Sequence, residues 1–225
     1  MAERWSQQIF WGWVMSLAAA AAGSQDLWFV SRASGLVLLV LFSVVVVLGV
    51  AARMGSSPKN WPRFVFIELH RTLALFAVAL LALHVVTAIL DPFVTIGWAA
   101  TVVPFLSPYR AWQIGLGTLA VDVAGAVIIT SLLRVRLGFR AWRAVHWLAY
   151  IAWPVAFVHS ITAGTDLTIW WVALTEWACA AVVAVAVVAR ILFAVRGSVV
   201  PGTPTATGVP PEIPGDFFSR ERAHR

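Results

Sequence analysis

The chain has 225 residues, of which 61% are hydrophobic and only 12% are charged, whereas an ordinary soluble domain carries about 25% charged residues. Its mean hydropathy is +0.87. The charged residues are too few to cover the surface of a soluble protein, and the composition therefore excludes a soluble globular protein. It predicts an all-α, polytopic membrane helix bundle surrounded by lipid. In such a protein the net charge of +6 reports orientation, and we expect no nucleic-acid partner.

Apolar runs predict six transmembrane helices. Their predicted limits in chain order are residues 5 or 9 to 22, 27–52, 64–90, 112–133, 142–161 and 167–195. The last five runs reach the ~20 residues that a helix needs to cross about 30 Å of hydrocarbon. They are continuous rather than alternating, which favours helices over a barrel. The first run is shorter, and its small residues 18–23 resemble a signal-peptide cleavage region. It is predicted as a span, with a cleaved signal as the alternative, which leaves five spans.

Two segments outside the spans are distinctive. The connection 91–111 has an apolar middle, 93–103, which we expect to lie on the membrane or to dip into it. The tail 196–225 is rich in Pro and Gly and is predicted to be a disordered cytoplasmic segment. The N-terminal segment 1–27 contains the first span, and residues 28–195 form one transmembrane domain.

The basic residues predict the orientation. Thirteen of the sixteen lie in the N-terminus, the connections 53–63 and 134–143, and the segment from Arg190 onward. Positive residues stay in the cytoplasm, so both termini are predicted to be cytoplasmic. Fifteen of the sixteen are Arg, and Ala and Val are abundant, which is typical of a GC-rich bacterial genome. We therefore predict a multi-pass protein of the bacterial cell (inner) membrane.

Four of the five histidines are predicted to lie inside the membrane. His70 and His84 are on the third span, and His146 and His159 are on the fifth, which runs in the same direction. His70 and His146 are therefore predicted at the cytoplasmic depth, and His84 and His159 at the outer depth. The two levels are about 20 Å apart. Two opposed neutral imidazoles in a dry interior suit the two axial positions of haem iron.

The helical phase of these residues is uneven. Fourteen residues, from His70 to His84, return to within about 40° of the same helix face, but the thirteen from His146 to His159 miss it by about 140°. We expect a kink or a tightened turn at Pro154 to correct the phase.

Other readings of the histidines remain open. A lone intramembrane histidine is more often an interhelical hydrogen-bonding residue. A proton relay would draw on Glu68, Asp122 and Glu176, but these lie on three different helices with no evident ladder. A di-iron site requires Glu-x-x-His pairs, which are absent, and the single Cys179 excludes disulfides and Cys-based metal sites. A transporter or assembly factor with structural or proton-carrying histidines is the alternative of a different class.

Haem propionates are anionic and need cations at the membrane edges. Arg71 and Arg143, with Arg140, lie near the predicted cytoplasmic site, and Arg32 and Arg110 near the outer one. For Arg140 and Arg143 the positive-inside rule is an equally good explanation.

Three stretches resemble the ferric reductase-like transmembrane domain family, which includes eukaryotic ferric reductases, NADPH oxidases and the bacterial haem-binding subunit of the methionine sulfoxide reductase system. They are WFVSRASGLVLLVLFSVVVVLG (28–49), ELHRTLALFAVALLALHVVTAILDPF (68–93) and RAWRAVHWLAYIAWPVAFVHSITAGTD (140–166). The resemblance covers roughly residues 28–195. It implies two b-type haems whose iron is bound by His70, His84, His146 and His159, and electron transfer from the cytoplasm to an acceptor outside. Some members bind a single haem, and others bind a flavin in addition. If this chain binds a flavin, we expect it to be FMN.

We expect the chain to depart from the ferric reductases and oxidases, because residues 196–225 predict a disordered tail rather than a C-terminal FAD/NADPH domain. The resemblance therefore favours a short bacterial member, similar to the methionine sulfoxide reductase subunit and acting as the membrane subunit of an oxidoreductase system. We expect a cytoplasmic flavoreductase or a membrane quinol as donor, and an exported redox protein or a small acceptor outside. A quinone-linked reductase that has lost or gained a haem is the competing redox interpretation.

Overall fold

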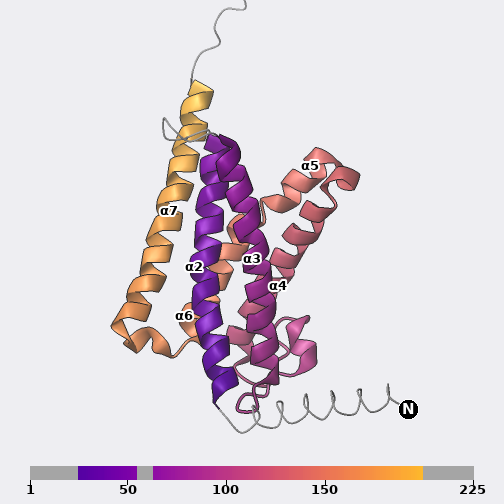
Figure 1. Ribbon diagram of the computed structural model, residues 1–225, viewed down its shortest axis with the longest axis vertical. Helices are drawn as coiled ribbons and strands as arrows, with labels where there is room; N and C mark the ends of the chain where they lie inside the picture. The colour runs from indigo at the N-terminus through magenta and orange to yellow at the C-terminus, as the bar shows by residue number, and fades with distance from the viewer. Residues whose placement is uncertain (1–24, 55–62, 200–225) are drawn as a thin grey trace, which may run out of the picture. The chain divides into compact units, whose positions relative to one another are not determined.

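The structure is a computed structural model that describes residues 25–54 and 63–199, with side chains up to residue 195. The predicted first span, the signal-peptide alternative, the connection 55–62 and the tail from residue 200 lie outside these ranges. Within them the chain is helical and contains no strand. The helices are α2 (Asp26–Met54), α3 (Arg63–Leu90), α4 (Ala111–Leu132), α5 (Arg134–His146), α6 (Ala149–Ala163) and α7 (Trp170–Val199), with short 3₁₀ helices η1 (Trp98–Thr101) and η2 (Asp166–Thr168) (Figure 1).

Four of these helices, α2, α3, α4 and α7, are long and apolar enough to cross a membrane. The pair α5 and α6 forms a fifth candidate span that bends by 45°. The all-α membrane architecture is therefore confirmed. The predicted count of six is not, because the described residues hold four or five spans. The helix α7 also continues past the predicted tail boundary at residue 196, to Val199.

The predicted connection 134–143 is helical rather than a loop. The four arginines of this segment make it polar, which is why the sequence predicts a loop. Arg is nevertheless a good helix former. The arginines and the apolar side chains between them make α5 an amphipathic helix. The helix is interrupted only at Gly138, whose φ of 78° is available to a residue without Cβ.

The break between His146 and His159 lies at Trp147–Leu148, not at Pro154, which is inside α6. Two short-range bonds mark a tightened turn there: Leu148 N–H donates to Val145 O, and Ile151 N–H donates to Leu148 O, both at 2.9 Å. A 3₁₀ turn advances about 120° per residue instead of about 100°. The turn therefore rotates α6 in the direction that corrects the phase of the two histidines.

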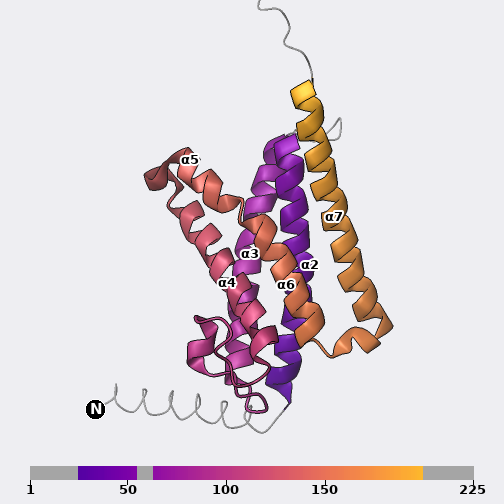
Figure 2. The same cartoon turned by 180° about the vertical axis from the view of Figure 1, so that it is seen from behind.

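Contacts divide the chain after Arg190, and the packing described here belongs to residues before that point. The helix α2 runs along α3, α4 packs against α5 and α6, and α6 also contacts α2 (Figures 1 and 2). The apolar connection 91–110 folds back onto α4 instead of extending away from it. Thr118 Oγ1 donates to Ala100 O at 2.7 Å, and a Cβ at Gly115 would come within 2.2 Å of the Phe105 ring.

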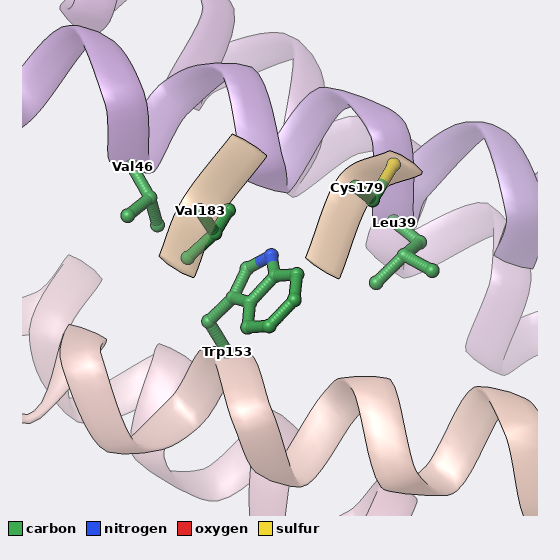
Figure 3. Close-up of a cluster of buried hydrophobic side chains, with 5 residues drawn as sticks. All are labelled: Leu39, Val46, Trp153, Cys179 and Val183. Atoms are coloured by element: carbon green, nitrogen blue, oxygen red, sulfur yellow. The ribbon is translucent and has the colours of Figure 1, made fainter. Parts of the chain in front are cut away.

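The buried core joins three helices. Leu39 and Val46 of α2, Trp153 of α6, and Cys179 and Val183 of α7 pack together (Figure 3). Inside this core the indole N–H of Trp153 donates to Ser43 Oγ at 3.0 Å. A polar group buried away from water needs such a partner, so this bond fixes the rotation of α6 against α2.

Replacing Trp153 with Phe is expected to lower the free energy of unfolding by about 1 kcal/mol, because it removes an interhelical hydrogen bond and leaves a small void. Thermal unfolding in detergent measures the loss. Trp98→Phe is the control, since Trp98 is 72% exposed and should unfold like the parent protein.

Candidate functional site

The structure brings the four intramembrane histidines together as the two pairs that their depth predicted. The ring centroids of His70 and His146 are 6.3 Å apart, with an interplanar angle of 70°. Those of His84 and His159 are 6.4 Å apart, with an angle of 76°. Two pairs from different helices therefore share one separation and one near-perpendicular arrangement.

Three of the four rings are held from behind by a backbone carbonyl. His70 Nδ1 bonds Val45 O at 2.8 Å, His84 Nδ1 bonds Ser31 O at 2.8 Å, and His159 Nδ1 bonds Gln113 O at 2.7 Å. A carbonyl oxygen only accepts, so Nδ1 carries the proton in each ring. The lone pair of the neutral imidazole is then on Nε2, which forms no hydrogen bond with any residue in the described ranges. This is the tautomer of a histidine that binds a metal through Nε2.

A glycine makes each of these contacts possible. The accepting carbonyl always lies four residues before a glycine against which the ring packs: Gly49 for His70, Gly35 for His84 and Gly117 for His159. A Cβ on these glycines would come within 3.2, 2.9 and 2.6 Å of the respective rings; the last two contacts would force the ring to move, and the first would be tight. The absent side chain therefore lets the imidazole reach the helix backbone.

The fourth ring is held differently. His146 Nδ1 is buried and has no hydrogen-bond partner among the described residues. The ring instead stacks on Trp142, with centroids 5.0 Å apart and planes 29° apart. The indole N–H of Trp142 donates to Ser131 Oγ at 3.2 Å.

The two pairs line one large apolar cavity. Its volume is about 1770 Å³, beyond the ~300–1,000 Å³ of a pocket for one drug-sized ligand. Its wall includes all four histidines and side chains of α2, α3, α4 and α6, most of them Ala, Val and Leu. The cavity can therefore accommodate more than one flat, mainly apolar group.

The two arginines predicted at the outer level converge on one turn after α6. Arg32 Nε forms an ion pair with Asp166 Oδ2 at 2.7 Å, and Arg110 donates from Nη1 to Ala163 O at 3.3 Å. Arg32 lines the cavity near His84 and His159, whereas Arg110 is not part of the cavity wall. The structure therefore separates Arg32 and Arg110, for which the sequence predicts the same role.

Of the three arginines predicted at the cytoplasmic level, Arg71 and Arg143 line the cavity and Arg140 does not. Arg71 is largely exposed and lies 4.0 Å from Glu68, a separation at which an exposed pair contributes little. Arg143 lies over the Phe139 ring, 5.3 Å from its centroid. Neither guanidinium is committed to a strong partner within the described structure.

Sequence reasoning missed two features of the site. The first is the set of anchoring glycines, although the 14-residue interval from Gly35 to Gly49 matches that from His70 to His84. The second is the partner of Glu176, a residue that the sequence offered only for a proton relay: Glu176 is 4% exposed and accepts a hydrogen bond from Ser160 at 2.8 Å. No spacing rule links Glu176 to Ser160, so only the packing of α7 on α6 could reveal that contact.

No cluster of three or more metal-ligating side chains occurs among the described residues. A family model for the ferric reductase like transmembrane component matches residues 34–157. The chain belongs to this family. The match includes His70, His84 and His146 and ends just before His159. No curated protein and no solved structure matches the chain. Membership establishes a multi-pass membrane protein with a ferric reductase-like domain.

Replacing Gly117 with Ala is expected to push the His159 ring off Gln113 O and to cost about 1–3 kcal/mol of unfolding free energy through overpacking. Gly125→Ala on the same helix is the matched control. Nothing lies within 4 Å of the Cβ it would introduce, so it should be neutral or slightly stabilising. Thermal unfolding of the two variants side by side tests the anchor. Equal stabilities would contradict it.

Proposed function

We propose that this protein transfers electrons across the membrane through two b-type haems, one bound by His70 and His146 and one by His84 and His159. The observation that carries the proposal is the centroid separation of 6.3 and 6.4 Å. Two imidazoles that bind one metal from opposite sides have their ring centroids about 6.4 Å apart. This distance is the sum of two metal–nitrogen bonds of about 2 Å and two ring radii of about 1.2 Å.

The same separation argues against a direct hydrogen bond between the rings. An N–H···N contact of about 2.9 Å would bring the centroids of two rings to about 5.3 Å. Both pairs are about 1 Å wider than that. In addition, three of the rings already use Nδ1–H on a backbone carbonyl. A hydrogen bond between the two paired rings therefore does not account for their separation, and the interhelical bonds that three of the rings do form use Nδ1 and leave Nε2 without a partner among the described residues.

The number of ligands favours haem over a bare ion. Each pair offers two nitrogens, too few for the four protein ligands of a structural metal site, whereas a porphyrin supplies the other four donors and needs only two axial groups. The cavity of about 1770 Å³ with aliphatic walls suits two such groups. When bound, haem supplies a one-electron ferric/ferrous couple in the membrane interior. A flavin such as FMN is a further planar ligand for the same cavity.

The side chains near the two pairs fit the carboxylate edges of haem. Arg32 at one level, and Arg71 and Arg143 at the other, line the cavity and can neutralise propionates. Arg32 has its Nε committed to Asp166, which leaves its two terminal nitrogens to donate. Arg110 would act through the turn it contacts, by holding Ala163 and its neighbours in place.

The arginine-rich ends of the helices would face the bacterial cytoplasm, so electrons would enter at the His70–His146 pair and leave at the His84–His159 pair. The donor would be a cytoplasmic flavoreductase or a membrane quinol, and the acceptor an exported redox protein or a small molecule. By this proposal the chain is the membrane subunit of an oxidoreductase system, similar to that of methionine sulfoxide reductase.

The purified protein is expected to show a sharp α band of b-type haem in a dithionite-reduced minus oxidised spectrum, with two haems per chain. Replacing any one of the four paired histidines with Leu should remove one haem and leave the other bound. His224→Leu is the control and should retain both. Absence of the band after expression with added haem would contradict the proposal.

The ring angles predict a second spectroscopic property. Axial imidazoles with nearly perpendicular planes give a low-spin ferric signal of unusually large anisotropy in electron paramagnetic resonance. The angles of 70° and 76° predict such a signal from both sites at low temperature. A rhombic signal of ordinary width, typical of parallel imidazoles, would contradict this arrangement of the rings.

A further inference from the structure

We propose that Trp142 and Ser131 position His146 in place of the glycine–carbonyl anchor of the other three histidines. As a consequence, the His70–His146 site holds its haem more weakly than the His84–His159 site. This inference rests on the proposed function and concerns the difference between its two sites.

The anchor recurs at regular intervals. On α2 the glycines Gly35 and Gly49 are fourteen residues apart, and they anchor His84 and His70 of α3. On α4, Gly117 anchors His159 of α6. The corresponding position on α4, fourteen residues after Gly117, is Ser131, next to the level of His146. The sequence therefore places a serine at the position where repetition of the pattern requires glycine.

The carbonyl that would anchor His146 is already occupied. Four residues before Ser131 is Val127, the analogue of Val45, Ser31 and Gln113. Val127 O accepts from Ser131 Oγ at 2.6 Å and from Thr130 Oγ1 at 3.2 Å. The hydroxyl of Ser131 thus takes the position on the carbonyl that a histidine Nδ1 occupies at the other three sites.

Trp142 bridges the gap between His146 and this carbonyl. Its ring stacks on the His146 ring at 5.0 Å, and its N–H donates to Ser131 Oγ at 3.2 Å. The Arg134 guanidinium also lies over the indole, 5.2 Å from its centroid. The fourth histidine is therefore connected to the fourth carbonyl only through an indole and a hydroxyl.

A stacked ring is a weaker support for a metal ligand than a hydrogen bond at Nδ1. The N–H···O=C bond fixes the tautomer, limits rotation and raises the basicity of Nε2, and losing such an outer partner typically lowers metal affinity 10–100-fold. The His84–His159 site has two anchored ligands, and the His70–His146 site has one. We expect haem to leave the His70–His146 site at least about tenfold faster than it leaves the His84–His159 site.

Transfer of haem from the purified holoprotein to excess apomyoglobin measures these rates. Two phases of equal amplitude are expected, and the fast phase should be missing in His70→Leu but present in His84→Leu. Trp142→Ala should accelerate the fast phase and leave the slow phase unchanged, which also shows that the variant is folded. Trp98→Ala, on an exposed ring, is the control and should change neither phase.

Ser131→Gly tests the anchor directly, because it frees Val127 O and makes room for the ring. It should slow the fast phase and sharpen the low-spin resonance of that haem, which a purely structural role of Ser131 would not do. A single phase, a fast phase that survives His70→Leu, or a fast phase that neither Trp142→Ala nor Ser131→Gly changes would overturn the inference. A parent protein that binds no haem would instead contradict the proposed function.

Discussion

The hydrogen bond from a histidine Nδ1 to a backbone carbonyl is the interaction on which the rest of the site depends. It is formed by Nδ1, and it sets both the tautomer and the direction of Nε2. In the helix, that carbonyl already accepts its own i+4 N–H, so the imidazole must approach the oxygen from the side. Only a residue without a side chain at i+4 leaves that approach open, which couples the glycines of α2 and α4 to the histidines of α3 and α6.

This coupling explains why the helices pack in pairs. The α2–α3 and α4–α6 pairs carry the histidine–glycine contacts, and close approach at small residues is how helices associate without a hydrophobic driving force in lipid. Between the pairs the walls stay apart and leave the cavity. The core around Trp153 then joins α2, α6 and α7. Packing and site geometry are therefore set by the same few positions.

Much of this could be predicted from the sequence, and the failures have physical causes. The apolar runs gave the helices because hydrophobic length is sufficient to recognise a span. The histidine pairs could be predicted because the two spans that carry them run in the same direction. Histidines at corresponding positions of these spans therefore lie at the same depth in the membrane. The α5 segment was misread as a loop because its arginines hide an amphipathic helix. The break was assigned to Pro154, whereas hydrogen bonding after His146 places it at Trp147–Leu148. The ligand role of the histidines remains a proposal.

The sequence by itself determined the membrane class, the positions of four spans, the pairing of His70 with His146 and of His84 with His159, and the family. Each of these follows from local hydropathy, spacing or motif, which are properties of the chain in order. Only the tertiary structure decided the ring separations, the carbonyl behind each ring, the role of the glycines and the divergence of Arg32 from Arg110. These depend on contacts between residues that are 21 to 134 positions apart, and such contacts exist only once the helices have packed.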